Sequence, residues 1–137
     1  MFEKLVRDHG RVAVDLPYSY DGNCLFHSLA YALHGCVTVE ELRAAACDEM
    51  ASRGYRREYA PFLPPSWGRY VRRMRDGGVW GDGFVMLALA RVLCSDITVV
   101  SGSYAETFHT PYASAHPHYV LAYERAHYMP TRRVSLR

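Results

Sequence analysis

The sequence predicts a single α+β domain, in which helices come first and strands come late. Between residues 24 and 93, apolar residues recur at the spacing of amphipathic helices. Later runs, Ile97 to Val100 and Tyr119 to Tyr123, are β-branched or apolar and have the length of strands. Helices followed by strands are typical of an α+β fold with a small sheet. The 137 residues, half of them apolar, are enough for one hydrophobic core, so we expect one domain over residues 1–137.

The first half of the chain predicts one short strand and then two helices. Arg11 to Leu16 alternates between apolar and polar residues and predicts the strand. Cys24 to Leu33 has helical apolar spacing, so a helix is expected to begin at or beside Cys24. Thr38 with Glu41 three residues later forms a capping-box pattern that opens the second helix, and Gly54 is expected to end it. The apolar face of this second helix is expected to consist of Leu42, Ala45, Ala46 and Met50.

Two further helices are expected before the late strands. Ser66 is a candidate cap for a third helix, whose apolar stripe consists of Trp67, Tyr70, Val71 and Met74. The other positions of that helix carry Arg69, Arg72, Arg73 and Arg75, which are expected to face solvent. Asp82 caps a fourth helix, Gly83 to Leu93, which is apolar on nearly every side and is therefore expected at the centre of the fold.

The strand region ends the chain. A long loop or hairpin is expected between the two strands, from Ser103 to Pro117, and a last short strand around Val134. The chain stops soon after that strand, which favours a piece cut from a longer polypeptide.

Composition excludes several classes of function. The formal net charge of +2 is weak for nucleic-acid binding, which needs a concentrated basic face, so no nucleic-acid partner is expected, and a nucleic-acid binder that uses the stripe from Arg69 to Arg75 is a disfavoured alternative. No apolar run approaches the roughly 20 residues that span a bilayer, so no membrane partner is expected. Met1 to Gly10 is charged and has no apolar signal core, which favours a cytoplasmic protein. The four cysteines form no C-x-x-C pair, so reduced thiols are expected, and no metal or cofactor.

The run Asp21-Gly22-Asn23-Cys24 directly before an apolar helix is the most informative motif. A helix N-terminus lowers the pKa of a cysteine, because its unpaired N–H groups favour negative charge, and the same groups bind an oxyanion. Gly22 permits a tight turn and a close substrate, while Asp21 and Asn23 can fix the loop by side-chain hydrogen bonds. Spacing alone leaves two interpretations open: a nucleophile, or a buried structural cysteine.

A cysteine nucleophile needs a general base, and the chain has seven histidines. His118 and His127 flank the late strand that begins at Tyr119, where a strand end can deliver a base to the nucleophile. His27 and His34 lie on the helix of Cys24 itself, and that rigid element restricts their reach. Local reasoning does not choose among these four.

Three blocks of the sequence, in order, resemble the ovarian-tumour (OTU) family of cysteine proteases. D-G-N-C-L-F-H-S-L-A, residues 21–30, resembles the nucleophile motif of the family. G-V-W-G-D-G-F-V-M-L-A-L-A-R-V-L-C-S-D-I-T-V-V, residues 78–100, is similar to its second block, and H-Y-V-L-A-Y-E-R-A-H-Y, residues 118–128, to its last. Together they cover about half the chain. The resemblance implies a papain-like OTU fold, with a small, mostly antiparallel sheet packed between helices, and a deubiquitinase that hydrolyses isopeptide bonds at the C-terminus of ubiquitin.

The resemblance also assigns catalytic residues. Cys24 is then the nucleophile, and the histidine after the strand and turn, His127, is the base in preference to His118. Many family members have Asp or Asn two residues after that histidine to orient its ring, whereas this chain has Met129. The acceptor must then be an upstream acid, a backbone carbonyl, a hydroxyl such as that of Thr131, or nothing. Asp21 is the first choice and Asp15 the second; Gly22 and Asn23 complete the oxyanion loop.

The substrate expected from the resemblance is ubiquitin or polyubiquitin, with other ubiquitin-like modifiers as further candidates, and a monomeric enzyme. Trp80, Gly81 and Tyr128 are expected to line a narrow channel for the glycines of the ubiquitin tail, although Trp80 fits a core residue equally well. The acids expected to attract the basic tail are Asp82, Glu106 and Glu124. The alternative is an OTU-like module that binds ubiquitin without cutting it, which the Met129 departure favours. The compact size favours a viral or mobile-element source.

Overall fold

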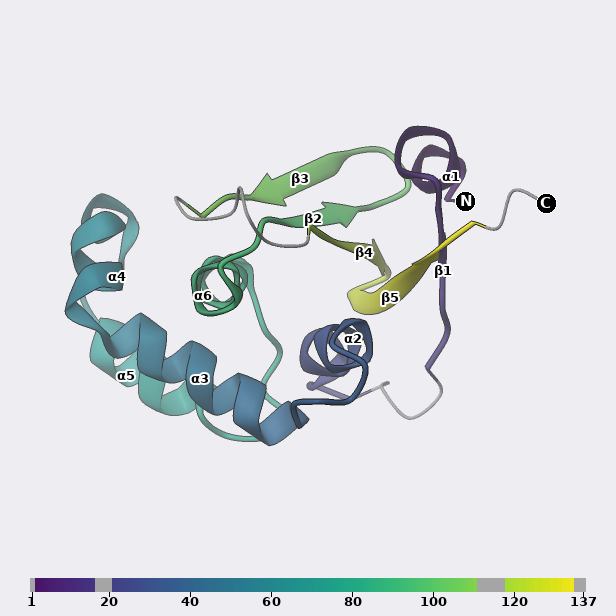
Figure 1. The fold of residues 1–137 in the computed structure, drawn as a ribbon. Coiled ribbons are helices and arrows are strands. Elements are labelled where there is room, and N and C mark those ends of the chain that lie inside the picture. Colours follow the sequence, from purple (N-terminus) through teal and green to yellow (C-terminus); the bar gives the residue numbers. More distant parts are fainter. Residues whose placement is uncertain (1, 17–20, 111–117, 135–137) are drawn as a thin grey trace.

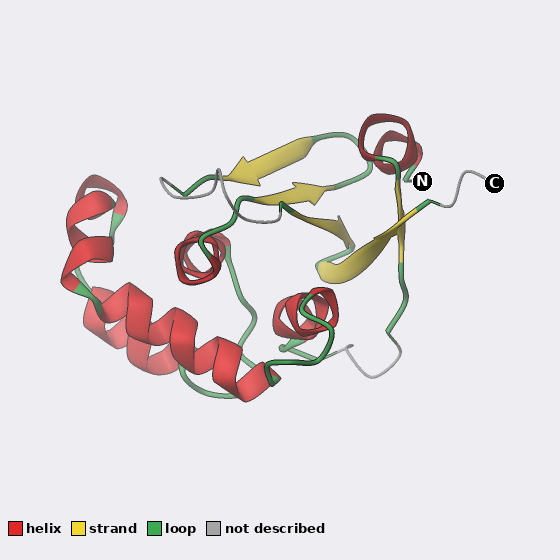
Figure 2. Ribbon diagram, viewed as in Figure 1, coloured by secondary structure: helices red, strands yellow, loops and turns green. Residues whose placement is uncertain are grey.

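A computed structural model describes residues 2–16, 21–110 and 118–134. In these ranges the helices are α1 (Glu3–His9), α2 (Cys24–Ala32), α3 (Val39–Ala51), α4 (Arg53–Glu58), the 3₁₀ turn η2 (Ala60–Phe62), α5 (Trp67–Met74) and α6 (Gly83–Leu93). The strands are β1 (Arg11–Ala13), β2 (Ile97–Val100), β3 (Ala105–Phe108), β4 (Tyr119–Glu124) and β5 (His127–Arg133). The fold is the predicted α+β arrangement (Figures 1 and 2).

The strands form one sheet in the order β1-β5-β4-β2-β3. Only the β2–β4 pair is parallel; the β1–β5, β4–β5 and β2–β3 pairs are antiparallel, which confirms the mostly antiparallel sheet. Strands β4 and β5 form a hairpin in which Glu124 pairs with His127. This hairpin therefore places His127 at the very start of β5.

The sheet lies between helices on its two faces. Helices α2 and α6 cover one face, with α3 and α5 farther out, while α1 lies near the opposite face (Figure 1). Neighbouring residues of β4 show the two sides: Leu121 belongs to the large core with α2 and α6, whereas Val120 and Ala122 pack with Leu5 of α1. Burial of apolar side chains in the large core, at about 25 cal/mol for each Å² removed from water, holds α2 and α6 on the sheet.

The elements expected from the sequence are mostly confirmed. The capping box of Thr38 and Glu41 is present, and the carboxylate of Asp82 accepts the N–H groups of Phe84 and Val85 at the start of α6. β2 and β4 lie where the strands were predicted. Of the predicted segment from Ser103 to Pro117, β3 supplies a strand, and residues 111–117 lie outside the described residues.

Several boundaries were wrong. Helix α3 ends at Ala51, because Ser52 is extended and its hydroxyl accepts the N–H of Tyr55, which starts α4. Gly54 therefore lies inside α4 and does not end α3. The side chain of Ser66 makes no capping hydrogen bond to α5. The first strand stops at Ala13, and α1 had no predicted counterpart.

The last strand is the correction that matters most for the site. It was expected to be short and to lie around Val134, but β5 runs from His127 to Arg133. Its first part, His127 to Pro130, pairs with β4, and its last part, Thr131 to Arg133, pairs with β1. His127 therefore lies in the part of the strand that pairs with β4, and not in a loop.

Candidate active site

Cys24 is the first residue of α2, and its thiol lies against the start of β5. The backbone N–H of Tyr128 donates to Cys24 Sγ over 3.5 Å. Since His127 is the residue before Tyr128, the fold brings the first and last blocks of the sequence together at one point. The Cys24 side chain is 1% exposed, so the thiol is covered in this conformation.

Burial decides the acidity of this thiol. The pKa of Cys24 is raised from its usual value, chiefly because burial disfavours the thiolate. The N–H groups of Tyr128 and Leu25 act in the opposite direction, and the charge of Asp21 adds to the increase. The helix N-terminus was expected to lower this pKa, and here desolvation outweighs it.

Arg43 fastens the loop that precedes Cys24. Its guanidinium donates from Nη2 to the Gly22 carbonyl over 3.3 Å and to Asn23 Oδ1, and from Nη1 to the Met74 carbonyl over 3.0 Å. It also lies over the Phe26 ring, with Cζ 4.4 Å from the ring centroid. With only 4% of its surface exposed, Arg43 ties the nucleophile loop to α2, to α3 and to the end of α5.

Sequence reasoning missed Arg43, although one signal was present. Positions 43, 46, 47 and 50 follow the i, i+3, i+4, i+7 spacing of a buried helix face, and all four are buried. An arginine in such a stripe needs acceptors on a neighbouring segment. The predicted face, which was chosen from apolar residues, included Ala45 and left out Arg43 and Cys47.

Close backbone contacts hold the other side of the loop. A Cβ atom on Gly22 would lie 1.5 Å from the Gly78 carbonyl oxygen, so only glycine fits at position 22. Asn23 Oδ1 also accepts the N–H of Gly78 over 3.2 Å. At the second residue of α2, Leu25 Cδ2 lies 2.7 Å from the position that a Cβ atom on Gly81 would occupy. Residues 78–81 therefore run directly across the start of α2.

The expected oxyanion donors are engaged within the loop itself. The N–H of Asn23 donates to Asp21 Oδ1 over 2.9 Å, and the N–H of Cys24 donates to the Asp21 carbonyl over 3.3 Å. An incoming oxyanion has to compete with these two acceptors. The covered thiol and the engaged donors together describe a closed conformation of the nucleophile loop.

The two histidines that flank β4 lie in different surroundings. His127 is 7% exposed and follows a turn whose two residues, Arg125 and Ala126, both have positive φ angles of 51° and 61°. His118 lies at the other end of β4, where its Nε2 is 2.6 Å from Thr98 Oγ1. Only His127 is adjacent to the residue that contacts the Cys24 thiol.

The candidates for an acceptor beside His127 differ in what already engages them. The Thr131 hydroxyl donates to the Val120 carbonyl over 2.6 Å and accepts a hydrogen bond from Arg11, so it serves the sheet. Met129 packs against the small core around Leu5. Asp15 is exposed after β1. The Asp21 carboxylate lies beside the nucleophile, bound to the Asn23 N–H and 3.9 Å from His27 Nε2.

A hollow of about 310 Å³ adjoins His127. Its walls are Trp80, Glu124, Arg125, His127 and Met129. Trp80 is 49% exposed, so it belongs to this surface and not to the core. The ring of Tyr128, the residue after His127 on β5, packs at a tilt against the ring of Tyr123 on β4, with centroids 4.7 Å apart.

The expected acids are distributed around the same region. Glu124 lines the hollow beside His127. Burial and the nearby charges of Cys24, Asp82 and Glu106, together with Tyr123, raise the pKa of Tyr128 to about 12. The Asp82 carboxylate, however, accepts the Tyr70 hydroxyl and two N–H groups of α6, so its structural role as a helix cap uses its oxygens.

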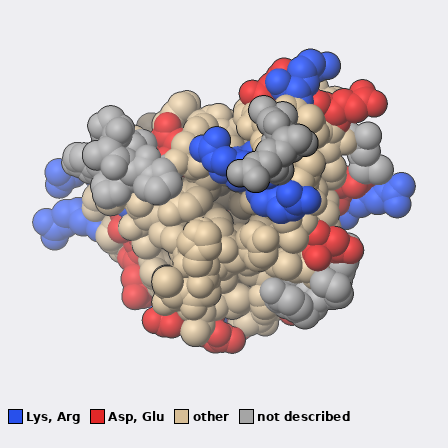
Figure 3. Space-filling model, turned by 45° about the vertical axis from the view of Figure 1, so that its right-hand side comes forward, with Lys and Arg blue, Asp and Glu red and all other residues tan. Residues whose placement is uncertain are grey.

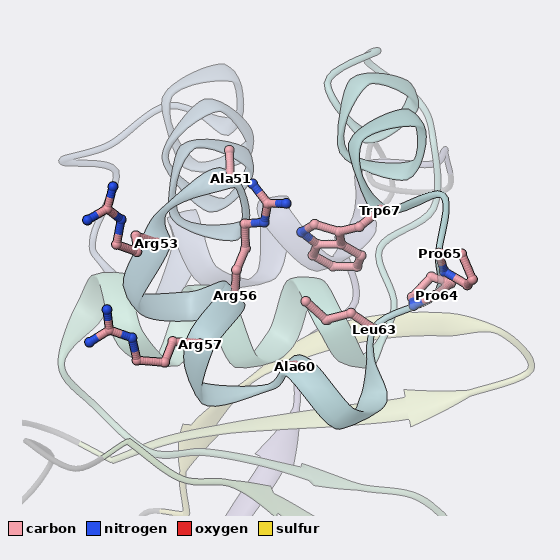
Figure 4. Close-up of a pocket in the computed structure, with 9 residues that line it drawn as sticks. All are labelled: Ala51, Arg53, Arg56, Arg57, Ala60, Leu63, Pro64, Pro65 and Trp67. Atoms are coloured by element: carbon pink, nitrogen blue, oxygen red, sulfur yellow. The ribbon is translucent and has the colours of Figure 1, made fainter.

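Other features lie away from this point. A hollow of about 670 Å³ is bounded by α3, α4, η2 and α5 and includes Arg56, Leu63 and Trp67 (Figure 4). In the part of the chain that the structure describes, no group of three or more potential metal-ligating residues comes together. None of the helices in the described ranges has the length and hydropathy to cross a bilayer.

Comparison with known proteins agrees with this geometry. Among curated proteins none matches the chain in sequence. The OTUD1 OTU domain shares the fold with a TM-score of 0.75 at 21% identity, over 96% of this chain and 91% of that one. An OTU domain solved in complex with ubiquitin gives 0.71 at 20% identity, over 88% and 69%. The viral OTU domain protease of Dera Ghazi Khan virus gives 0.69 at 18% identity, over 89% and 80%.

The sequence profile described as "OTU-like cysteine protease" matches residues 19–131, a range that contains both Cys24 and His127. The chain belongs to the OTU-like cysteine protease family.

Proposed function

We propose that this chain is a thiol-dependent deubiquitinase that hydrolyses isopeptide bonds at the C-terminus of ubiquitin. The observation that carries the proposal is the hydrogen bond from the Tyr128 N–H to Cys24 Sγ, which joins the expected nucleophile to the strand of the expected base. Family membership and the fold shared with an OTU domain bound to ubiquitin support the substrate.

In the proposed reaction, His127 removes the proton of the Cys24 thiol and the thiolate attacks the carbonyl carbon of the last glycine of ubiquitin. The C–N bond then breaks, and the lysine amine leaves with the proton returned by His127. The resulting thioester is attacked by water, whose proton passes to His127, and the thiolate is released with the ubiquitin carboxylate. A thiol with a raised pKa makes this base more important than it would be for a preformed thiolate.

The tetrahedral intermediate needs donors for its oxyanion. The N–H of Cys24 and those of the loop formed by Asp21, Gly22 and Asn23 are the proposed donors. They become available when Asp21 releases them, so substrate binding and opening of the loop are coupled. Arg43 keeps the rest of the loop fixed during this change, because it binds the Gly22 carbonyl and the Asn23 amide rather than Asp21.

Asp21 is also the proposed third member of the site. Its carboxylate is close enough to Cys24 to raise the pKa of the thiol, and neither Met129 nor the engaged Thr131 hydroxyl is a better acceptor for the His127 ring. Its release of the loop N–H groups would free the carboxylate for His127 in the substrate complex.

The ubiquitin tail is proposed to reach Cys24 between residues 78–82 and the β4–β5 hairpin. Trp80 and Tyr128 form the walls, Gly81 allows close approach, and Glu124 and Glu106 attract the basic tail. Asp82 contributes its charge, although its oxygens are used by Tyr70 and α6. Polyubiquitin and other ubiquitin-like modifiers are further substrates, and we propose a monomeric cytoplasmic enzyme.

The proposal for the base is tested by comparing two histidine variants in a di-ubiquitin cleavage assay. His127→Ala should abolish turnover, whereas His118→Ala should retain it, because the His118 ring is bound to Thr98 at the other end of β4. If His118→Ala alone abolishes turnover in a folded protein, the assignment of the base is wrong.

A ubiquitin-binding module without catalysis is the second candidate. Met129 in the place of an acceptor and the covered, weakly acidic thiol favour it. The two candidates differ in one measurement: binding of ubiquitin without cleavage of any di-ubiquitin linkage supports the module, and multiple turnover supports the enzyme.

A further inference from the structure

The far end of α2 from Cys24 lies beside a second hollow, of about 1,020 Å³, that the proposed reaction does not use. It is bounded by the last turn of α2, by the start of β4 and by the ends of β1 and β5. Along the helix axis, Cys24 and Ala32 are about 12 Å apart at 1.5 Å for each residue. The lining reaches back along α2 as far as His27, one turn from Cys24, and does not include Cys24 itself.

The rim of this hollow is basic. The basic side chains that line it are Arg11, Arg132, Arg133, His27, His34 and His118. None of the described residues that line it is acidic, and the nearest printed acid contact is His27 with Asp21 at 3.9 Å. Figure 3 shows Lys and Arg side chains gathered at a hollowed part of one face, with the acidic side chains toward its margins.

Two of these arginines lie opposite each other in a strand pair, where their like charges repel. Arg11 of β1 and Arg133 of β5 are direct partners in the antiparallel pair. Like charges directly opposite each other in such a pair destabilise a sheet. Arg11 is half-buried and its pKa is lowered, first by burial and then by the charge of Arg133. Its Nη1 is aimed by hydrogen bonds to the carbonyl and hydroxyl of Thr131.

The floor of the hollow has a different character. Ala30, Leu33, Tyr119 and Val120 provide apolar surface between the basic groups. The volume is large for a single inorganic ion, and the combination of an apolar floor with a cationic rim matches an extended segment that carries both apolar and acidic side chains. The ubiquitin tail, which is basic, is repelled by the same rim.

We propose that this hollow binds an acidic peptide segment of a partner protein, with carboxylates at Arg11, Arg132 and Arg133 and apolar side chains against α2 and β4. Binding relieves the repulsion between Arg11 and Arg133. The segment holds the partner on the protein without occupying the site around Cys24, so binding is independent of cleavage.

The test is fluorescence anisotropy with a fluorescein-labelled peptide in which Glu alternates with Leu. A peptide with Gln in place of Glu and a phosphoserine peptide without acidic residues serve as the other probes. Wild type and Cys24→Ala should bind the Glu-Leu peptide equally, with affinity that falls as salt is added. Arg132→Gln/Arg133→Gln should weaken binding about tenfold, because two exposed ion pairs with the peptide are lost.

The matched control is Arg53→Gln/Arg57→Gln, which removes the same charge from the hollow on α4. Arg53 and Arg57 are among the residues that line that hollow (Figure 4) and are not among those that line the hollow at the end of α2, so this variant should bind the Glu-Leu peptide as wild type does. Equal weakening by both double variants would show a net-charge effect and overturn the proposal. Binding of the Gln peptide as tightly, binding of the phosphoserine peptide alone, or no binding at low salt would each overturn it as well.

Discussion

The two halves of the candidate site are built differently. The loop before Cys24 is held by Arg43, by Gly78 and by its own hydrogen bonds, so both its backbone and its side chains are fixed. The proposed base, His127, follows a two-residue turn in which Arg125 and Ala126 both have positive φ, where glycine and asparagine are the preferred residues. The loop before the proposed nucleophile is thus held by contacts with other segments, at Arg43 and at Gly78, whereas the backbone of the proposed base is placed by the β4–β5 hairpin.

This difference predicts where substitutions act. Changes to the nucleophile loop should be costly, because many contacts depend on one geometry. Some changes near His127 are expected to raise turnover, because the position that supplies a hydrogen-bond acceptor in many family members holds Met129.

The largest effect is expected for Gly22→Ala. Its new Cβ would lie 1.5 Å from the Gly78 carbonyl, so the two segments must separate. A displacement near 1 Å at a catalytic group costs about 100-fold in rate, and overpacking costs about 1–3 kcal/mol of stability. Gly77→Ala is the control, because a Cβ there meets nothing within 4 Å. Equal kcat/KM for the two variants in ubiquitin-substrate cleavage would show that this contact does not position the nucleophile.

Arg43→Met should have the next largest effect. It keeps the apolar stem, removes the donor of the Gly22 and Met74 carbonyls, and leaves Asn23 Oδ1 with the Gly78 N–H alone. Loss of buried charged hydrogen bonds should lower the free energy of unfolding by about 2–3 kcal/mol. We expect kcat to fall with little change in KM, because the loop holds the attacking group and not the ubiquitin body.

Arg43→Lys should restore part of that kcat, since one ammonium can serve some of these acceptors. Arg75→Met is the comparison for stability, because Arg75 forms an exposed ion pair with Asp48, and such pairs contribute about 0–1 kcal/mol. Chemical denaturation together with steady-state kinetics separates the outcomes. An Arg43→Met protein with normal kcat would show that Arg43 serves only the fold.

Met129→Asn tests the His127 side of the candidate site by adding a polar group instead of removing a contact. An amide oxygen two residues after His127 is a hydrogen-bond acceptor that Met129 does not provide, so turnover should rise several-fold. Stability should fall by about 1 kcal/mol, because a half-buried side chain that packs with the Leu5 cluster becomes polar. Met129→Leu keeps the packing without an acceptor and should turn over as wild type does. A folded Met129→Asn protein with unchanged or lower kcat would contradict the comparison.

The smallest effect is expected for Asp21→Asn on the acidity of the thiol. The Asp21 charge raises the pKa of Cys24, so its removal should lower that pKa and move the pH profile of Cys24 alkylation toward lower pH. The asparagine oxygen can still accept the Asn23 N–H. Alkylation is followed by mass spectrometry of the Cys24 peptide, with Cys36→Ser to remove an exposed competitor. If Asp21 also orients His127, kcat falls in the same variant; a profile that moves to higher pH would contradict the electrostatic account.

The sequence was sufficient where local pattern decides structure. The capping residues Thr38 and Asp82, the apolar helix α6 and the β-branched strand β2 each carry their signal within a few residues. Helix α4 has no such signal, since it contains Gly54 and buries only Tyr55. The extent of β5 depends on pairing with β1, far away in the chain, and a local pattern cannot contain that.

The candidate site divides in the same way. The resemblance of the three sequence blocks to the OTU family identifies Cys24 and His127 as candidates, and the fold places the segments that carry them side by side. The role of Arg43 depends on carbonyls of Gly22 and Met74 that only tertiary structure brings to it. The raised pKa of Cys24 likewise depends on burial, which the position of Cys24 at a helix start does not reveal.

The central claim is that Cys24 is a nucleophile directed at the ubiquitin C-terminus. It is tested most directly with ubiquitin that carries an electrophile in place of its last glycine carboxylate, followed by intact-mass measurement. The account predicts one covalent adduct with the wild-type protein, none with Cys24→Ala, and an undiminished adduct with Cys36→Ser, which removes an exposed thiol. A wild-type protein without an adduct, or an adduct that persists in Cys24→Ala, would contradict it.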